Sequence, residues 1–127
     1  MNAVDSSGWI EYFTKKENAE FFIAPIGDLE RLLVPTICIY EVFKRLLVER
    51  DEESALLAVG LMSYGREVVL DRKIAIDAAQ TSREMKLAMA DSIILATARA
   101  YDATLWTQDE HFKDIKGVKY IEKKPRK

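Results

Sequence analysis

The sequence predicts one α/β domain: a central parallel sheet with helices on both faces, in a three-layer α/β/α arrangement. Short apolar runs alternate with longer segments of helical periodicity. Strands that alternate with helices need crossover connections, and right-handed crossovers produce a parallel sheet covered on both sides. The length of 127 residues and the hydrophobic content of 49% are typical of a single globular domain. We therefore expect residues 1–127 to form one domain.

The first half of the chain is expected to hold two strands. Residues 3–4 form a short strand that ends at Asp5, and residues 32–34 form a buried second strand. Pro35 and Thr36 follow that strand and favour a helix start, with Thr36 as a possible N-cap. Helical patterns cover residues 9–13, 18–23, 36–50 and 52–64.

The second half is expected to hold three strands and two helices. The strands are predicted at residues 67–70 (EVVL), 104–107 (TLWT) and 118–121 (VKYI), and the helices at residues 74–85 and 87–101. Residues 87–98 read LAMADSIILATA and are nearly all apolar or small. Their one carboxylate, Asp91, costs free energy in a segment built for burial unless a partner compensates it.

The composition excludes several classes of site. The single cysteine, Cys38, excludes an internal disulfide framework and a multi-cysteine zinc site, and the single histidine, His111, argues against a histidine-rich zinc enzyme. A metal would therefore have to be held by carboxylate oxygens. The net charge of −2 argues against bulk attraction to nucleic acid. A basic C-terminal stretch is more often a solvated terminus than a binding site, and binding is kept as the alternative; its basic residues are Lys116, Lys119, Lys123, Lys124, Arg126 and Lys127.

The sequence predicts a cytoplasmic protein. No apolar run approaches the roughly 18–20 residues that a membrane-spanning helix needs. The first residues, MNAVDSSGW, lack the charged-then-apolar pattern of a signal peptide.

Four acidic residues follow strands or lie near the starts of helices. Asp5 directly follows the first predicted strand, and Asp109 follows the TLWT strand by two residues. Glu41 lies about two turns into the helix after the second strand, and Asp91 lies near the start of its helix. Because ligands of open parallel sheets bind at the carboxyl ends of the strands, we expect these four carboxylates to meet at one edge of the sheet.

Such a group of acids favours metal-assisted phosphate chemistry. Crowded carboxylates repel one another, and Mg²⁺ or Mn²⁺ relieves that repulsion by binding their oxygens. Two such ions could activate a water and stabilise the leaving oxygen of a phosphodiester. Acyl transfer would instead need a Ser-His or Cys-His pair.

Each acid also has a purely structural alternative. Asp5 and Asp109 could each cap a following helix. Glu41 could pair with Arg45 one turn later, and the helix dipole could favour Asp91 in a first turn. These explanations would have to hold four times independently to remove the predicted site.

Four segments resemble, in order, the motifs of the PIN domain, and within it the VapC-type toxins of toxin–antitoxin pairs. The first two segments are VDSS, an Asp followed two residues later by Ser, and PTICIYE, a proline followed six residues later by Glu. The last two are ADSIILATA, an Asp before an alanine-rich helix, and WTQDEHF, which has the pattern Thr-x-Asp-x-x-Phe. The resemblance maps the acids onto Asp5, Glu41, Asp91 and Asp109, and two supporting hydroxyls onto Ser7 and Thr107.

The resemblance implies a PIN fold and a metal-dependent ribonuclease that acts on RNA with Mg²⁺ or Mn²⁺. It also implies a homodimer and inhibition by a cognate VapB-type antitoxin. The four acids would bind the metal and position the attacking water, and the two hydroxyls would orient carboxylates. Two positions depart from the family pattern: Gly8 stands where relatives commonly have an aliphatic residue, and His111 where some carry a further acid. A histidine beside Phe112 at a helix end is more often structural than functional.

Two other functions remain as alternatives. Asp71 after EVVL imitates the phospho-acceptor of a receiver-like signalling domain. Receivers, however, need an acidic pair at the first strand, where Asp5 is followed by two serines, and a lysine after the late strand, where Gln108 and Asp109 stand. A catalytically silent PIN-like binding module would not need all four acids.

The helices predicted at residues 36–50 and 52–64 carry more apolar surface than one small sheet needs. We expect part of that surface to serve dimer or antitoxin contacts. Candidate contact residues, for which core packing is the alternative, are Phe21, Phe22, Tyr40 and Phe43.

Overall fold

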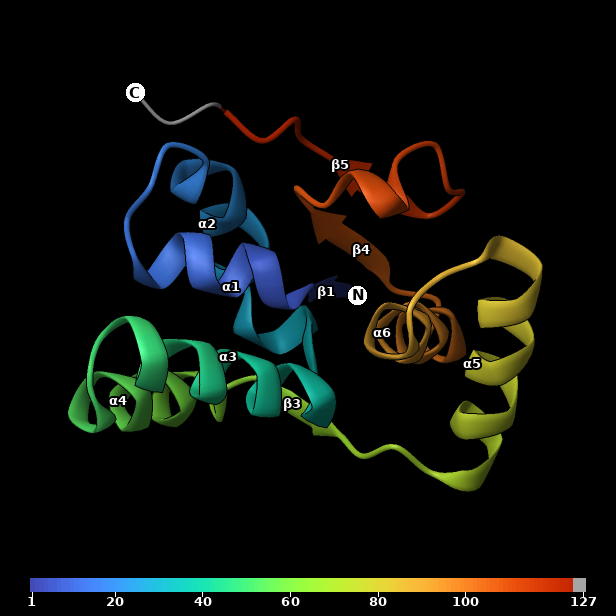
Figure 1. Cartoon of the computed structure of the whole chain (residues 1–127), viewed down its shortest axis with the longest axis horizontal. Helices are drawn as coiled ribbons and strands as arrows, with labels where there is room; N and C mark the ends of the chain where they lie inside the picture. Colours follow the sequence, from blue (N-terminus) through green and yellow to red (C-terminus); the bar gives the residue numbers. More distant parts are fainter. Residues whose placement is uncertain (125–127) are drawn as a thin grey trace.

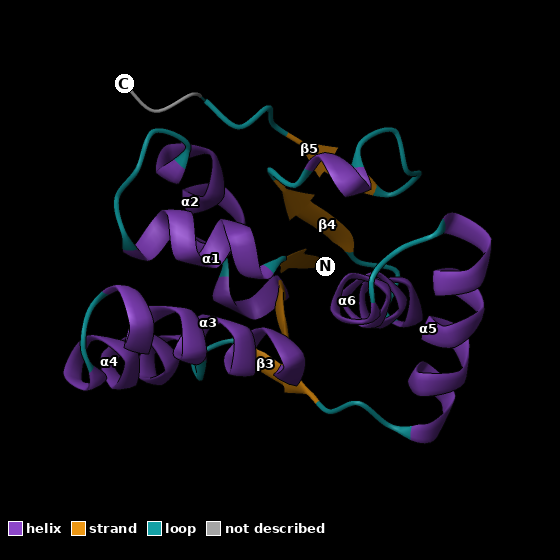
Figure 2. Ribbon diagram, in the orientation of Figure 1, coloured by secondary structure: helices purple, strands orange, loops and turns teal. Residues whose placement is uncertain are grey.

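Five parallel strands form the central sheet of the computed structural model, which describes residues 1–124 (Figures 1 and 2). The strand order is β3-β2-β1-β4-β5. The inner strands β1, β2 and β4 are mostly buried, as their apolar sequences predict, whereas the edge strands are more exposed. The strands are β1 (Asn2–Val4), β2 (Leu32–Pro35), β3 (Arg66–Val68), β4 (Thr104–Thr107) and β5 (Val118–Tyr120).

Helices cover both faces of this sheet, which confirms the predicted α/β/α class. From β1 the chain steps to β2 and β3, and it then returns past β1 to reach β4 and β5. Right-handed crossovers in these two directions put the first four helices on one face and the last two on the other. Figure 1 shows these two groups on opposite sides of the strands. The helices are α1 (Ser6–Phe13), α2 (Ala19–Gly27), α3 (Thr36–Glu49), α4 (Glu52–Met62), α5 (Arg72–Met85) and α6 (Met89–Ala100), with short 3₁₀ turns η1 (Leu29–Arg31) and η2 (Glu110–Phe112).

Helix α6 is the most buried helix of the fold. Every side chain from residue 92 to residue 98 is buried, because α5 covers the side of α6 that the sheet does not. The helix begins at Met89, two residues later than the apolar pattern predicts. Lys86 adopts a left-handed conformation that ends α5, and the Ser82 hydroxyl donates to the Leu87 carbonyl at 2.7 Å, so these residues form a turn.

Aspartate side chains cap the N-termini of α1, α4 and α5. Asp51 accepts from the Ser54 amide at 2.7 Å, and Asp71 accepts from the Ile74 amide at 2.8 Å. Because Asp71 caps α5, it has a structural role. Thr36 is the first residue of α3 rather than its N-cap, which is Pro35.

The strand order rules out the receiver-like alternative. Receiver domains have the order 2-1-3-4-5, in which the third strand lies inside the sheet beside the first. Here β3 pairs only with β2 at the edge of the described sheet. Asp71, which follows β3, is therefore separated from Asp5 by the width of β2.

The start of α1 explains the glycine at position 8. A Cβ atom there would lie 2.6 Å from Cε1 of Phe22 and 2.7 Å from Cγ1 of Val4, closer than packed atoms approach. An aliphatic residue at this position would need α2 to move away. Asp5 leads directly into α1, which begins at Ser6.

The aromatic residues of α2 and α3 divide between core and surface. Phe22 is fully buried, Phe21 packs against Trp106 with ring centroids 5.1 Å apart, and Phe43 is partly buried against the core. Core packing is therefore correct for these three. Tyr40, in contrast, has 59% of its surface exposed.

Cys38 lies at the interface between α3 and β1. Its side chain is fully buried, with Sγ 3.8 Å from the Val4 carbonyl oxygen, and burial raises the pKa of its thiol.

The basic C-terminal side chains that are described, such as Lys116 and Lys123, are exposed; Arg126 and Lys127 lie outside the described residues. Within residues 1–124, no helix has the length and apolar character needed to cross a membrane.

Candidate functional site

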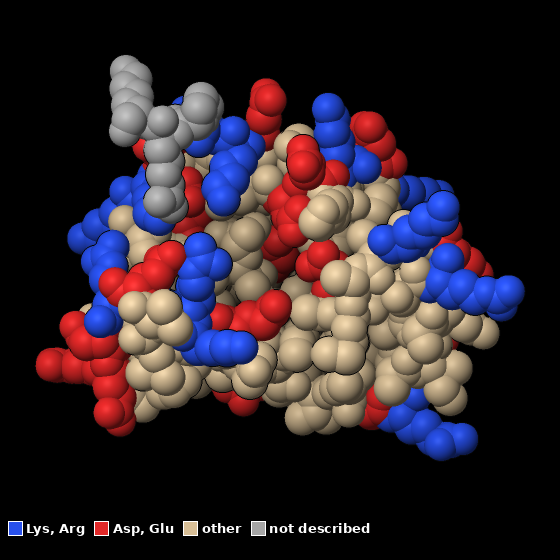
Figure 3. Space-filling view, in the orientation of Figure 1, with Lys and Arg blue, Asp and Glu red and all other residues tan. Residues whose placement is uncertain are grey.

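The four acids predicted from the sequence line one cavity of about 420 Å³. Asp5 directly follows β1 and Asp109 follows the neighbouring strand β4, while Glu41 comes from α3 and Asp91 from the first turn of α6. The connections that leave β1 and β4 run in opposite directions, which makes the ends of these strands the switch point of the sheet, where α/β folds bind ligands. In Figure 3, acidic side chains gather in a hollow near the middle of the face, and basic side chains lie around it.

Asp5 is buried and held by three donors at the end of β1. The Gly8 amide donates to Oδ1 at 2.9 Å, Ser7 Oγ donates to both carboxylate oxygens at 2.9 and 2.8 Å, and Thr107 Oγ1 donates to Oδ2 at 2.7 Å. Asp5 therefore caps α1 and lines the cavity at the same time. Ser7 and Thr107 lie where supporting hydroxyls were expected, and Thr107 also accepts from the Asp109 amide at 2.9 Å.

The electrostatics of the site disfavour its negative charges. Burial is the main cause that raises the pKa of Asp5 to about 7, although the hydrogen bonds from Thr107, Gly8 and Ser7 oppose it. Burial also raises the pKa of Asp91, and the nearby charges of Asp109 and Glu41 add to that effect. None of the ion pairs within residues 1–124 joins Asp5 to a lysine or arginine. The carboxylates thus favour a bound cation.

Glu41 is fixed by a serine rather than by an arginine. Ser6 Oγ donates to Glu41 Oε1 at 2.6 Å, which ties the start of α1 to α3. Arg45 pairs instead with Glu49 at 2.7 Å, so the predicted alternative of a Glu41–Arg45 pair is wrong. Ser6 was not predicted from the sequence as a partner of Glu41, although its position directly after Asp5 could have indicated that it lies at the site.

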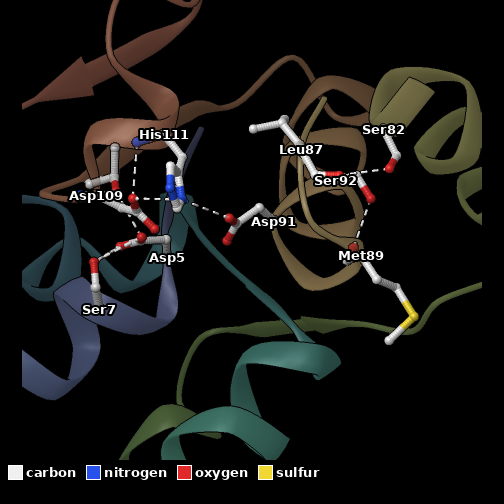
Figure 4. Close-up of polar contacts among 10 residues, drawn as sticks. Asp5, Ser7, Ser82, Leu87, Met89, Asp91, Ser92, Asp109 and His111 are labelled. Atoms are coloured by element: carbon white, nitrogen blue, oxygen red, sulfur yellow. Dashed lines mark hydrogen bonds and ion pairs between the residues drawn. The ribbon is translucent and has the colours of Figure 1, made fainter. Parts of the chain in front are cut away.

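His111 faces the acids instead of packing into the core (Figure 4). Its Nδ1 lies 3.2 Å from Asp109 Oδ1 and 3.6 Å from Asp91 Oδ2, and the ligand atoms of these three residues all lie within 4.8 Å of one another. Its side chain is 67% exposed, while Phe112 takes the buried position. His111 therefore lies exposed beside Asp91 and Asp109, and a structural role for it stays a prediction. Its position two residues after Asp109 was the sequence feature that could have predicted its place beside the acids.

A buried polar network supports the site from behind. The Gln108 amide donates to Glu11 Oε1 at 3.1 Å, and Asn18 Nδ2 donates to Gln108 Oε1 at 3.0 Å. The Asn18 backbone amide donates to Glu11 Oε2 at 2.9 Å, so the Glu11 carboxylate has donors on both oxygens. This network holds the segment between Thr107 and Asp109 against α1.

The donor set fits a hard divalent cation. Carboxylate oxygens are the ligands that Mg²⁺ and Mn²⁺ prefer. The grouping of Asp91, Asp109 and His111, beside the unpaired charge of the buried Asp5, gives such a cation both ligands and a reason to bind.

Solved structures of low sequence identity share this fold. A toxin–antitoxin complex from Klebsiella pneumoniae is 24% identical with a TM-score of 0.77, covering 94% of this chain and 96% of that one. VapC20 from Mycobacterium tuberculosis, a toxin that cleaves the sarcin–ricin loop, is 14% identical with a TM-score of 0.76, covering 98% and 100%. DNA-bound VapBC from Salmonella typhimurium is 18% identical with a TM-score of 0.73, covering 96% and 98%. Among curated proteins, none matches the chain.

The sequence also matches a family model. The model described as the PIN domain covers residues 3–118, which include the segments that supply all four acids. The match agrees with the order of the motifs, with the parallel sheet and with the place of the cavity at the ends of β1 and β4. This chain belongs to the PIN-domain family.

Proposed function

We propose that this protein is a metal-dependent endoribonuclease that hydrolyses RNA phosphodiesters with Mg²⁺ or Mn²⁺. The observation that supports it best is the meeting of four acids from four separate segments in one cavity. Membership of the PIN family and the fold shared with a toxin that cleaves the sarcin–ricin loop support the choice of RNA as substrate. RNA as substrate would place the protein in the cytoplasm.

Each residue has a proposed task at this site. Asp5, Glu41, Asp91 and Asp109 hold the cation and position the attacking water. A bound Mg²⁺ or Mn²⁺ supplies charge neutralisation at the phosphodiester and a more acidic water. The hydroxyls that fix the ligand carboxylates are Ser6 for Glu41, and Ser7 and Thr107 for Asp5.

Substitution of Asp91 tests this function. The Asp91→Asn protein should lose at least about 100-fold of its metal-dependent cleavage of total RNA, because one negative ligand becomes a neutral amide. Its circular dichroism spectrum should match that of the wild type, and its expression should no longer arrest growth. The matched control is Asp102→Asn, which makes the same chemical change at an exposed residue outside the cavity. Undiminished cleavage by Asp91→Asn in Mg²⁺ would show that the proposal is wrong.

We further propose that the protein is the toxin of a type II toxin–antitoxin pair. Two of the similar structures are a toxin–antitoxin complex and a DNA-bound VapBC assembly. The surface of α3 and α4 would supply contacts for a VapB-type antitoxin or a second copy of the chain. Its exposed apolar side chains are Leu47, Val48, Leu56, Leu57 and Leu61.

The oligomeric state tests whether the surface of α3 and α4 joins two copies of this chain. We expect a dimer by light scattering over the micromolar range, because small soluble monomers rarely leave such apolar surface uncovered. The Leu57→Lys variant should shift the mass toward the monomer if α4 forms the contact. A wild-type monomer at high concentration would contradict the dimer and leave the surface to the antitoxin.

A further inference from the structure

One wall of the acidic cavity is not acidic. Besides Glu41, helix α3 lines the cavity with Tyr40, Lys44, Arg45 and Val48. Residues four apart lie on the same side of a helix and about 6 Å apart along its axis. The wall therefore begins at the acids and extends along α3 through a basic and aromatic stretch.

Tyr40 is placed differently from the packed aromatic residues of this protein. It is 59% exposed, and the ammonium of Lys44 lies 5.7 Å from the centre of its ring. An exposed aromatic ring beside a cation in a cavity wall is the arrangement that proteins use to hold unpaired bases.

Lys44 is the better placed of the two cations for binding a phosphate. Arg45 shares its charge with Glu49 through the 2.7 Å ion pair, whereas none of the ion pairs described for residues 1–124 includes Lys44. The acids repel the backbone of a polyanion, so a substrate needs positive charge close to them. Lys44 supplies it one helical turn from Glu41.

We propose that Tyr40 and Lys44 form a nucleotide-holding wall, in which Tyr40 stacks on an unpaired base and Lys44 binds the neighbouring phosphate. This inference rests on the proposed ribonuclease function and names how its substrate is held. The wall would position the phosphodiester beside the four acids. It selects unpaired RNA, because the base faces of a duplex are already stacked on one another.

The test measures binding without cleavage, using Ca²⁺ in place of Mg²⁺. The probe is a single-stranded 12-nucleotide RNA of mixed sequence that carries fluorescein for affinity or 2-aminopurine for stacking. The Tyr40→Ala variant should bind about 5- to 100-fold more weakly and lose the quenching of 2-aminopurine, while Tyr40→Phe should keep both. Tyr64→Ala, which removes an exposed tyrosine outside the cavity, is the matched control and should behave as the wild type.

The salt dependence of binding tests the lysine separately. The logarithm of the affinity falls as the logarithm of the salt concentration rises. Removal of one phosphate contact decreases the steepness of this fall by about 0.7 for single strands. Lys44→Ala should show this decrease, and Lys116→Ala, an exposed lysine outside the cavity, should not.

Several results would overturn the inference. These are wild-type affinity and quenching in Tyr40→Ala, equal affinity for a duplex of the same sequence, or no binding of RNA by the wild type. The first result would leave the wall to another occupant, such as an antitoxin segment. Cleavage of total RNA in Mg²⁺ is measured in parallel. Cleavage without dependence on Tyr40 overturns only this inference, whereas Tyr40-dependent binding without cleavage overturns only the proposed activity.

Discussion

Asp5 shows how one residue serves the fold and the candidate site at once. Its carboxylate caps α1 through the Gly8 amide, and the same carboxylate lines the cavity beside Asp109. Capping and metal binding were alternatives in the sequence. The structure shows the cap at a carboxylate that also lines the cavity, and metal binding by the same carboxylate stays a prediction. Asp109 repeats this arrangement, since it accepts from the His111 amide at 3.0 Å while its side chain lines the cavity.

The buried charge of Asp5 should make the metal-free protein less stable as the pH rises. Its pKa is raised from 3.8 to about 7, so the folded state binds a proton more tightly than the unfolded chain does. This contribution to stability is fully present below about pH 4 and is lost as the pH rises through about 7. We expect the wild type to lose on the order of 4 kcal/mol relative to Asp5→Asn over that range.

Urea unfolding of both proteins at a series of pH values, in a metal chelator, measures this difference. Saturating Mg²⁺ should reduce it, because a cation favours the ionised carboxylate. Parallel curves for the wild type and Asp5→Asn would mean that Asp5 does not titrate as its burial predicts.

At the scale of elements, the end of β4 is the segment that joins the site to the rest of the fold. Three successive side chains have three different tasks. Thr107 donates a hydrogen bond to Asp5, Gln108 donates a hydrogen bond to Glu11, and Asp109 lines the cavity. A small shift of this segment would move two of the groups that surround Asp5.

Gln108→Ala should therefore affect stability and activity together. It removes a donor from the buried Glu11 carboxylate, and it takes the acceptor from Asn18 Nδ2. We expect a loss of about 2–3 kcal/mol in the free energy of unfolding, measured by urea denaturation. Cleavage at a temperature where the variant is folded should also fall, because Asp109 is less well placed. Gln80→Ala, at an exposed position on α5, is the control; an equal effect of the two substitutions would show that the network carries no weight.

The sequence predicted the elements well because their causes are local. Apolar runs between charged residues located the strands, and β4 has the predicted bounds. Ends of elements were less predictable: α6 starts at Met89 because of the left-handed Lys86 and the hydrogen bond from Ser82. The order of strands and helices places all four acids at one edge of the sheet even when the end of an element is misplaced by two residues, so their meeting was predictable too. His111 and Ser6 were missed because the direction of a side chain depends on the tertiary structure around it.

At the scale of the whole molecule, the cavity exists only when both halves of the domain are folded. The acids come from positions between 5 and 109, and they are carried by segments from both directions of the sheet topology. A cation that joins them binds the native state alone, so it should stabilise the whole domain by an amount that rises with the logarithm of its concentration above the dissociation constant.

The buried thiol of Cys38 gives this domain an intrinsic probe of its own opening. A thiol-reactive disulfide cannot reach the sulfur while α3 lies against β1, and the chain has no second cysteine to obscure the signal. The absorbance of the released aromatic thiolate measures the rate of modification. This rate therefore reports how often α3 and β1 separate. Mg²⁺ should slow this reaction in the wild type and leave it unchanged in Asp91→Asn. An equal rate with and without Mg²⁺ in the wild type would mean that α3 separates from β1 without disturbing the metal ligands.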